Sequence, residues 1–498
     1  MSSVALGLCF ILATVALLVL RPRKAKDLPP GPVKPWRWFQ ELNDQYGPVV
    51  YLQMGRTPTI VLGTAQAAWE ILEKKSPVTS SRPRFIMGQE ILSNNLRGLM
   101  AAHGPFWKRW RRVSSFMQRA SDTYKPIQSL ESKQLMSELA KTPANYREHL
   151  ERYATSVVVM VTYGRRVHDI YNDEVVCLNR ETQDFLTSIN IPGKYLVESV
   201  PALLYLPHFL TPWRTAALKQ RERDKEYLTR LVNEVQSKME SGRAQPSFCR
   251  QLLEDREKND MGDLEIAYTC STPFGAGVET SAGSLSSFML ACAAFGPSFI
   301  PQAQKELDAV VGPDRLPTFE DFDDLPFIRA IVNETLRWRP VAVLGGTPHS
   351  STEDFVYQDM FIPKGSTIIA NLWGIHLNPV DFPDPHRFDP ERFMSKRDYP
   401  GPWQHSSFGY GRRVCPGQHL ASNSIYINIA RILWGFNLGK ARDENGQEID
   451  VDTFAYTDGF NSVPLPFPIS ITPRSPGHVV IIERENEAAQ EELKAYDL

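Results

Sequence analysis

Apolar residues follow helical spacing along most of the chain, while short β-branched runs lie toward its two ends. From about residue 66 to residue 345 the pattern of apolar positions is mostly helical. Strand-like runs rich in Val, Ile and aromatic residues are found at 49–52, 59–62, 354–370, 465–472 and 478–483. Helices therefore dominate, and the predicted fold class is mainly α with small β-sheets at the edges (α+β).

The first residues form a separate element. Val4 to Leu20 are seventeen uncharged and mostly apolar residues, just enough for a helix that spans a bilayer. Lys and Arg residues follow directly between positions 21 and 26, whereas a cleaved signal peptide carries its positive charge before the apolar segment. The pattern favours a retained anchor over a cleaved signal, with the rest of the chain in the cytoplasm.

Changes in composition predict the boundaries between the domain and its flanking segments. Residues 21–36 are basic and then Pro-rich, and Pro29-Pro30-Gly31-Pro32 predicts a stiff hinge. Residues 37–485 show no internal repeat or low-complexity tract, which predicts one large domain. The polar C-terminal tail at 486–498 is rich in Glu and Ala and is expected to be a frayed or exposed helix. Residues 1–20 are then a single transmembrane anchor in front of that domain.

Composition narrows the classes of function. The 498-residue chain is 42% hydrophobic, enough for a large core, and its formal net charge of −2 gives no support for nucleic-acid binding. Its six cysteines are widely spaced, without a Cys-x-x-Cys pair. That spacing argues against a disulfide scaffold or a zinc site and favours a reducing compartment.

One cysteine stands apart from the others because of its neighbours. Residues 408–417 read Phe-Gly-Tyr-Gly-Arg-Arg-Val-Cys-Pro-Gly. Glycines let the backbone turn tightly around Cys415, and Pro416 suits the start of a helix, whose free N–H groups and dipole stabilise a thiolate. Arg413 could neutralise an acidic group of a cofactor, and Phe408 could pack against a flat macrocycle. The simplest alternative is a buried free cysteine in a Gly-rich turn.

The spacing Phe-x-x-Gly-x-Arg-x-Cys-x-Gly resembles the haem-binding signature of the cytochrome P450 family. The resemblance implies haem b, iron protoporphyrin IX, with Cys415 as its metal ligand and with Phe408 and Arg413 among the cofactor-binding residues. It also implies the P450 fold, in which haem lies between the Gly277 helix and the Cys415 loop and helix. The resemblance runs from the anchor to about residue 475 and is closest to fungal microsomal members.

Two further motifs precede the cysteine in the order found in that family. Glu334 and Arg337 lie three residues apart and share one helix face, and Arg392 follows in Pro-Glu-Arg-Phe. An isolated surface pair of this kind contributes at most roughly 1 kcal/mol, so the pair alone is weak evidence. The resemblance implies a buried ionic triad of Glu334, Arg337 and Arg392 that locks the region around the haem, which is a structural role.

An apolar helical stretch contains residues 274–281, Phe-Gly-Ala-Gly-Val-Glu-Thr-Ser. Two glycines in mid-helix cost about 1 kcal/mol each, and a close approach by a flat cofactor would explain them. The segment resembles the family's oxygen-activation motif, which makes Glu279 and Thr280 the catalytic acid and hydroxyl that deliver protons, although Asp is commoner than Glu there. The alternative is a helix-packing glycine with Thr280 bonded back to its own helix. Pro273 could kink this helix or mark its start.

Cationic residues complete the site that the resemblance implies. Trp107 and Arg111 match the family's Trp-x-x-x-Arg helix, where both bind haem propionates, and His349 matches a further propionate contact. The basic residues between and beside them, Lys108, Arg109 and Arg112, are expected to point away from the haem. By resemblance this cationic surface docks an acidic reductase, although a basic run on a helix is commonly only a solvated face.

The resemblance implies a membrane-anchored haem-thiolate monooxygenase of the endoplasmic reticulum, with its catalytic domain in the cytosol. Electrons are expected from NADPH through a separate NADPH-cytochrome P450 reductase, because the chain shows no Gly-rich dinucleotide loop. The stretches that correspond to the family's pocket are largely apolar, with Phe85, Leu96, Ile191, Val343 and Leu344, and carry few charges. They favour a small or medium hydrophobic substrate, such as a fungal secondary metabolite.

Three other functions remain open at this stage. A haem-thiolate isomerase or dehydratase would need no reductase, but the intact pair Glu279 and Thr280 counts against it. A non-catalytic haem sensor or carrier would not need that pair either. A hydrolase with Cys415 as nucleophile and His405 or His419 as base is the third, and the sequence offers it no oxyanion site or orienting acid.

Overall fold

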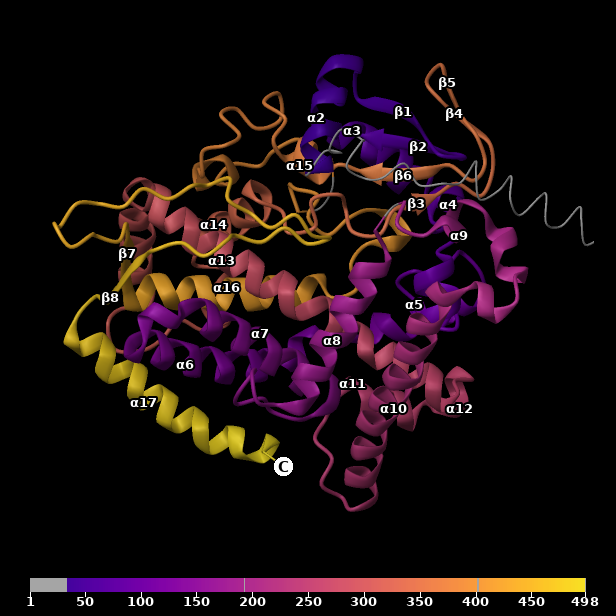
Figure 1. The fold of residues 1–498 in the computed structure, drawn as a ribbon. Helices are drawn as coiled ribbons and strands as arrows, with labels where there is room; N and C mark the ends of the chain where they lie inside the picture. The colour runs from indigo at the N-terminus through magenta and orange to yellow at the C-terminus, as the bar shows by residue number, and fades with distance from the viewer. Residues whose placement is uncertain (1–33, 192, 401–402, 498) are drawn as a thin grey trace, which may run out of the picture.

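The computed structural model describes residues 34–191, 193–400 and 403–497. Helices make up most of this part of the chain and small sheets lie at its edges, which confirms the predicted fold class (Figure 1). The predicted anchor at 1–20 and all but the last three residues of the predicted hinge lie outside the described residues.

The α-helices carry the bulk of the chain and its core. In chain order they are α2 (Pro35–Tyr46), α3 (Ala65–Ala68), α4 (Ser76–Thr79), α5 (Pro105–Arg119), α6 (Lys125–Lys141), α7 (Tyr146–Tyr163), α8 (Glu174–Ile189), α9 (Leu196–Ser199), α10 (Pro212–Glu240), α11 (Phe248–Glu254), α12 (Arg256–Asn259), α13 (Asp263–Val310), α14 (Pro326–Trp338), α15 (Leu372–His376), α16 (Gln418–Gly435) and α17 (Pro476–Leu493).

The strands are short and form three small sheets. They are β1 (Val49–Met54), β2 (Thr57–Leu62), β3 (His349–Ser350), β4 (Phe355–Tyr357), β5 (Met360–Ile362), β6 (Thr367–Ala370), β7 (Phe436–Gly439) and β8 (Ser470–Pro473). The largest sheet has the order β1-β2-β6-β3, in which β2 and β6 are parallel and the other pairs antiparallel. Strands β4 and β5 pair with each other, and so do β7 and β8.

The β1–β2 hairpin forms where the sequence predicts two strands around a turn. Its register pairs Met54 with Thr57, which leaves a two-residue loop. Gly55 occupies the first loop position with a φ of 62°, a conformation that suits glycine and matches the right-handed twist of the strands. The hairpin therefore follows from local turn chemistry as well as from the β-branched runs.

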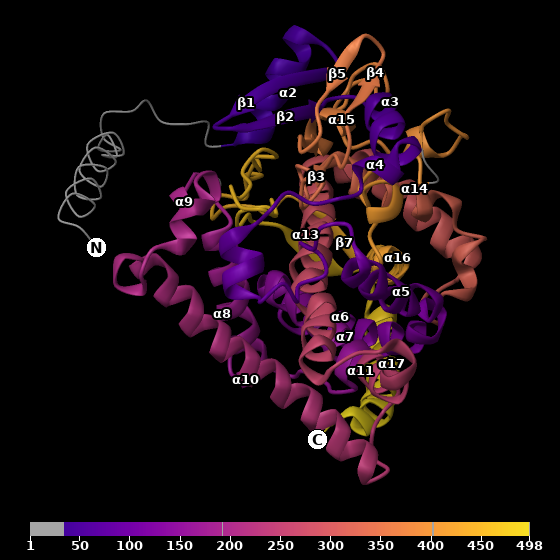
Figure 2. The ribbon, with the colours of Figure 1, turned by 90° about the vertical axis from the view of Figure 1, so that its right-hand side faces the viewer.

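Helix α13 is the central element of the molecule. It packs against α7, α10, α14 and α16, and Figure 2 shows it running through the middle of the protein. It begins at Asp263, ten residues before Pro273, so Pro273 lies inside the helix and does not start it. Of the described helices, α13 is the one long and apolar enough to cross a bilayer, but 78% of its most apolar window is buried inside the protein.

Helix α2 occupies the segment directly after the Pro-rich stretch. Its aromatic residues Trp36 and Phe39 are buried at 2% and 4% exposure, so the short connection forms part of the core. Trp36 packs in a cluster with Val343, Trp373 and Leu377. This packing corrects the expectation that Val343 lines the substrate pocket, because its side chain is 2% exposed and lies in this cluster.

The C-terminal segment differs from the prediction. The expected strand at 478–483 is wrong, because these residues lie in α17. Ser475 caps this helix by accepting a hydrogen bond from the His478 N–H, and Pro476 occupies its first turn. These start signals and the packing of one helix face override the strand propensity of the Val-Val-Ile-Ile run at 479–482.

Helix α17 also extends into the predicted polar tail and is anchored there. Its buried residues Ile482, Ala489 and Leu493 recur at helical spacing and pack in the main core. Arg166 donates a hydrogen bond to Gln490 at 2.9 Å, and its backbone N–H donates to the carbonyl of Tyr496 at 3.1 Å. The expectation of a frayed or exposed helix is therefore wrong, since one face of α17 is docked against the body of the protein.

Candidate functional site

The cysteine motif forms a tight loop in front of α16. The Cys415 N–H donates to the carbonyl of Phe408 at 2.9 Å, which closes the loop. Gly409 and Gly411 have φ angles of 75° and 58°, so both positions favour glycine. A Cβ on Gly411 would lie 2.3 Å from the carbonyl oxygen of Leu72, which no side chain could tolerate. The glycines of the motif are therefore explained by the backbone of this loop.

Cys415 lies where backbone and helix can stabilise a thiolate. Burial raises the pKa of the Cys415 thiol, while a hydrogen bond from the Gly417 N–H and the guanidinium of Arg111 act in the opposite direction. Helix α16 begins at Gln418, so the free N–H groups of its first turn lie close to the sulfur in sequence. A cationic metal centre would reverse the cost of burial, because a coordinated thiol loses its proton.

Arg413 and Trp107 meet beside this loop. The Arg413 guanidinium lies 4.2 Å from the centre of the Trp107 ring and donates to the carbonyls of Ser80 and Ala101, each at 2.7 Å. Burial lowers the pKa of Arg413 to about 8, and the nearby guanidinium groups of Arg82 and Arg111 act in the same direction. Arg413 is thus held in place by neutral acceptors and not by a carboxylate.

Arg82 is a further cation in this region and is buried at 7% exposure. Its guanidinium donates to the backbone carbonyls of Leu99, Thr347 and Pro348. Burial lowers the pKa of Arg82 to about 9. It is followed by Pro83 in an ordinary-looking Ser-Ser-Arg-Pro turn, so no sequence signal marked it as part of a site.

His349 lies in the same region and is neutral. Its Nδ1 lies 3.0 Å from the carbonyl oxygen of Thr79, where only a protonated nitrogen can bond. Burial, followed by the positive charges of Arg82 and Arg413, holds the pKa of His349 well below its usual range. A neutral ring with Nδ1 protonated presents Nε2 as an acceptor, so His349 would donate to a carboxylate only after gaining a second proton.

Two hydrogen-bond donors in this cluster of cations have no acceptor among the described residues. The Nε1 of Trp107 and one terminal nitrogen of Arg413 are buried without a hydrogen-bond partner. Among the described residues, Arg82, Arg111 and Arg413 form no ion pair with any acidic side chain. Buried donors are nearly always satisfied in folded proteins, so these residues fit a ligand with carboxylate groups. The two propionates of haem supply that chemistry beside the cysteine ligand.

Phe408 lies within the cysteine loop as predicted. Its ring centre is 5.8 Å from that of Trp403 and 6.0 Å from that of His405. Burial lowers the pKa of His405 to about 3, and its Nδ1 accepts a hydrogen bond from the Ser407 N–H at 3.2 Å. A pKa lowered this far makes His405 a poor base for the activation of a nucleophilic Cys415.

Glu279 and Thr280 lie on α13 within one turn of each other. The Thr280 hydroxyl donates to the carbonyl of Ala276 at 2.7 Å, as the alternative interpretation of this segment predicts. The Glu279 carboxylate is exposed and accepts a hydrogen bond from the Asn461 side chain at 2.6 Å. Both side chains therefore keep oxygen atoms that can accept or pass a proton.

The two glycines of this segment have a different role from the expected one. A Cβ on Gly277 would lie 2.9 Å from Cγ2 of Val158 on α7, and a Cβ on Gly275 would lie 2.5 Å from Nε2 of Gln183 on α8. The glycines thus allow close packing between helices, as the alternative interpretation predicts. Their presence gives no support for the expected close approach of a flat cofactor at these two positions.

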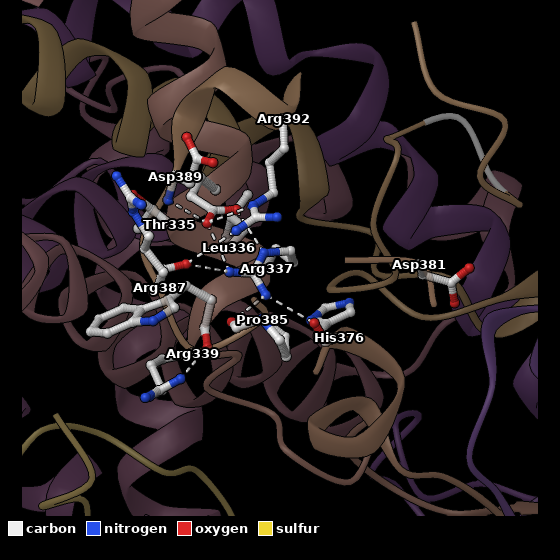
Figure 3. A network of polar contacts seen from close by, with 12 residues as sticks. Thr335, Leu336, Arg337, Arg339, His376, Asp381, Pro385, Arg387, Asp389 and Arg392 are labelled. Carbon is white, nitrogen blue, oxygen red and sulfur yellow. Dashed lines mark hydrogen bonds and ion pairs between the residues drawn. The ribbon is translucent and has the colours of Figure 1, made fainter. Parts of the chain in front are cut away.

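The ionic triad forms as the motifs predict. Arg337 donates to both carboxylate oxygens of Glu334 at 2.6 and 2.7 Å, and Nε of Arg392 lies 3.2 Å from Oε1. The Asp389 N–H donates to the same carboxylate at 2.8 Å. Arg337 also donates to the carbonyls of His376 and Pro385, both at 2.9 Å (Figure 3). All groups of this buried triad are satisfied, in keeping with a structural role.

A histidine connects the triad to the cysteine loop. Nε2 of His376 accepts a hydrogen bond from the Ser406 N–H at 2.9 Å, two residues before Phe408. The Ser407 hydroxyl donates to the carbonyl of Leu336, next to Arg337, at 2.8 Å. The sequence analysis named neither contact, because a single His in an apolar turn carries no distinctive spacing. The triad therefore supports the start of the loop that carries Cys415.

The basic residues of α5 differ in whether their charge is compensated within the protein. Arg109 donates to both carboxylate oxygens of Glu265 on α13, at 2.8 and 2.9 Å, so its charge is compensated within the protein. Lys108 and Arg112 are exposed, and Arg412 of the cysteine loop is exposed as well. Arg109 therefore offers less uncompensated charge to an acidic partner than Lys108 and Arg112 do, and the docking of a reductase here stays a prediction.

Comparisons with known proteins agree with this geometry. The family model described as cytochrome P450 matches residues 30–459. The curated relatives include cytochrome P450 monooxygenase 113 of Postia placenta, which is 39% identical over 476 residues and covers 91% of this chain and 92% of the relative. Cytochrome P450 monooxygenase verL of Clonostachys rogersoniana is 34% identical over 518 residues, with 97% and 94% covered.

Solved structures show the same fold. A zebrafish cytochrome P450, solved with abiraterone, superposes with a TM-score of 0.69 at 23% identity and covers 89% of this chain and 100% of that one. The family match, the fungal relatives and the cysteine site in front of α16 together establish a haem cofactor with a cysteine thiolate ligand. The chain belongs to the cytochrome P450 family and is a monooxygenase.

Proposed function

We propose that this protein inserts one atom of dioxygen into a small or medium hydrophobic molecule, by hydroxylation or a related oxidation. The observation that carries the proposal is the set of cations and unpaired donors beside Cys415, namely the buried Arg82, the half-buried Arg111 and Arg413, and the Trp107 indole. Such an uncompensated cluster fits a cofactor with two carboxylates at the position where a thiolate can bind iron.

The residues around Cys415 would bind the cofactor in different ways. Cys415 would hold the iron, and Arg111, Arg413 and Trp107 would donate to the propionates, with His349 close by. Phe408 would lie against the cofactor from the cysteine loop. Haem bound there supplies the activation of dioxygen, and the thiolate ligand favours cleavage of the O–O bond.

Glu279 and Thr280 would supply protons. The Thr280 hydroxyl donates to the Ala276 carbonyl, so its oxygen is left to accept a proton-donating hydrogen bond from water or a neighbouring acid. The exposed carboxylate of Glu279 exchanges protons with solvent and lies one residue away. Neighbouring positions on α13 thus carry an acid and a hydroxyl for proton delivery, which the rearranging and carrier alternatives do not require.

Electrons would come from NADPH through a separate reductase. The exposed cations Lys108, Arg112 and Arg412 lie on α5 and on the cysteine loop, and an acidic partner is the complementary surface for them. We further propose the endoplasmic reticulum membrane as the location, on the basis of the apolar segment at 4–20. A role in secondary metabolism, like the substrate itself, rests on the apolar character of the predicted pocket segments and on the fungal relatives.

The test is the carbon-monoxide difference spectrum of the dithionite-reduced membrane fraction, with Cys415→Ala as its control. A strongly red-shifted Soret band that disappears in the variant would establish ligation by Cys415, and turnover of apolar compounds with NADPH and a reductase would then be measured. A bound haem that converts substrate without NADPH would favour an isomerase or dehydratase. Haem binding without any turnover would favour a carrier, and an imidazole-type band would overturn the assignment of the ligand.

A further inference from the structure

The loop at 455–465 docks along one stripe of α13. The contacts on α13 are at Glu279, Gly283 and Ser287, which are spaced four residues apart and therefore share one helix face. The loop contributes Asn461 opposite Glu279, Val463 opposite Gly283 and Tyr456 opposite Ser287. The acid assigned to proton delivery is thus the end position of a continuous docking stripe.

The geometry of the three contacts fixes the loop closely. Nδ2 of Asn461 lies 2.6 Å from Oε2 of Glu279, and the Tyr456 hydroxyl lies 3.1 Å from Oγ of Ser287. Between them, a Cβ on Gly283 would lie 2.5 Å from Cγ1 of Val463, so only glycine allows this approach. The backbone of the loop therefore cannot shift along α13 without breaking a contact on either side of Gly283.

The loop is also rigid within itself. The Thr457 N–H donates to the carbonyl of Val463 at 2.9 Å, and the Leu465 N–H donates to that of Ala455 at 2.8 Å, so the segment is a small hairpin. The Ser462 N–H donates to the carbonyl of Val341 at 2.9 Å, which connects the hairpin to the segment that follows α14. Phe460, at the tip and next to Asn461, is 51% exposed.

We propose that Asn461 is a positioning residue that orients the Glu279 carboxylate for proton delivery. An amide nitrogen can only donate, so it holds Oε2 and leaves Oε1 to receive a proton from solvent and pass it on. Among the described contacts, Asn461 is the hydrogen-bond partner of the Glu279 side chain.

This inference rests on the proposed function, and its chemistry balances without a further reactant. When protons are delivered efficiently, two NADPH and two protons reduce one dioxygen to two waters in the absence of a substrate. When delivery fails, one NADPH and one proton reduce one dioxygen to hydrogen peroxide. The share of consumed dioxygen that is recovered as peroxide therefore reports on proton delivery, and it needs no identified substrate.

The hydrogen bond between Asn461 and Glu279 is tested in the purified full-length protein by exchanging the amide and the carboxylate between the two positions. Asn461→Asp keeps the shape and replaces the donor with a second carboxylate, so we expect the melting temperature to fall by about 2 °C. Glu279→Gln combined with Asn461→Asp restores one donor and one acceptor, so the double variant should recover that loss. Asn172→Asp is the matched control for a change of the same kind in a contact that does not include Glu279. The Asn172 amide donates a hydrogen bond to the carboxylate of Asp169 on the surface, also at 2.6 Å.

The role in proton delivery is tested with NADPH, a fungal reductase and dioxygen alone. We expect Asn461→Asp to raise the peroxide share in the same direction as Glu279→Gln, and the exchanged pair to stay raised, since its carboxylate then lies on the loop and no longer on α13 beside Thr280. Asn172→Asp should leave the peroxide share unchanged. A peroxide share that is unaltered in Asn461→Asp, or that rises further when this change is added to Glu279→Gln, overturns the inference.

Failure of haem ligation and failure of the Asn461 contact give different results. If the protein lacks a thiolate-type haem band, the proposed function is wrong, although the melting temperatures still report the contact. If the band is present and the exchanged pair fails to recover the melting temperature, the haem assignment stands and the positioning role of Asn461 is wrong.

Discussion

Two charge clusters flank the cysteine loop, and they are built in opposite ways. In the triad, Glu334 is shared between Arg337 and Arg392, and every arm of Arg337 donates to a carboxylate or a backbone carbonyl. In the cluster of Arg82, Arg111 and Arg413 there is no acid, and burial lowers the pKa of all three guanidinium groups. The first cluster is complete within the chain, whereas the second is complete only with an anionic ligand.

Under the proposed function, this difference separates residues that hold the fold from residues that would hold a cofactor. A satisfied buried ion pair leaves nothing for a ligand to gain, so its residues act through the backbone segments that they join. Unsatisfied buried donors and uncompensated charge destabilise the ligand-free protein, and the ligand recovers that cost when it binds. The following changes test this division, from the largest expected effect to the smallest.

Arg337→Ala should have the largest effect. It leaves the fully buried Glu334 with Arg392 and the Asp389 N–H but without its bidentate partner, and removal of one partner from a buried pair costs about 3–5 kcal/mol, a large share of the stability of a typical domain. We expect little folded protein and no thiolate-type band in the carbon-monoxide spectrum. Arg329→Ala on the same helix, where the side chain is 33% exposed, is the control and should fold and bind haem.

Arg111→Leu should separate stability from cofactor binding. The change removes a cation from a cluster that has no acid, so the melting temperature of the haem-free protein should stay the same or rise. Loss of a charged partner for a propionate should speed the transfer of haem to an acceptor protein by about ten- to a hundredfold. Arg112→Leu, at an exposed position on the same helix, should change neither quantity, and an equal effect of both variants would contradict the division.

Trp107→Phe should have a smaller effect of the same kind. The change removes a buried N–H that has no partner in the ligand-free chain, so haem should be released about tenfold faster while the haem-free protein keeps its stability. Trp434→Phe is the opposite case, because that indole donates to the carbonyl of Gly312 at 2.8 Å. It should lower the melting temperature and leave the rate of haem release unchanged.

The pH dependence of the haem-free protein should show the smallest effect. Burial lowers the pKa of Arg82 to about 9, whereas the unfolded chain keeps this proton to higher pH. Stability rises with pH wherever the unfolded state binds more protons, so the melting temperature should rise from about pH 8 to about pH 10 relative to Arg82→Gln. With haem bound, the melting temperature should rise less with pH relative to Arg82→Gln, since propionates favour the charged form of the guanidinium. A difference that is equally steep with haem bound would show that Arg82 faces no carboxylate.

Much of the site could be predicted because its residues lie at fixed spacings along the chain. The cysteine loop and the triad depend on glycines, arginines and a glutamate at positions set by one turn or one helix face, and these signals are visible in sequence. Arg82, His376 and Asn461 could not be predicted in this way. Each acts through a contact with a segment that is remote in the chain, and each stands in an ordinary local context.

The fold shows the same limit. The β1–β2 hairpin follows from its strand runs and its glycine, whereas the Val-Val-Ile-Ile run at 479–482 predicts a strand and forms a helix. The helix forms because α17 can bury Ile482, Ala489 and Leu493 against elements made hundreds of residues earlier. Similarly, the glycines of the Glu279 segment reflect Val158 and Gln183, neighbours that no local pattern reveals.

The docked C-terminal helix also sets an order of events during synthesis. Arg166 emerges early, but Gln490, with which it bonds, lies 324 residues later. At a translation rate of about 5–20 residues per second, this partner is made roughly a quarter of a minute to a minute afterwards. During that interval the face of the protein that α17 covers is open to solvent and to chaperones. Docking of α17 is therefore a late step, which follows the synthesis of the face that it covers.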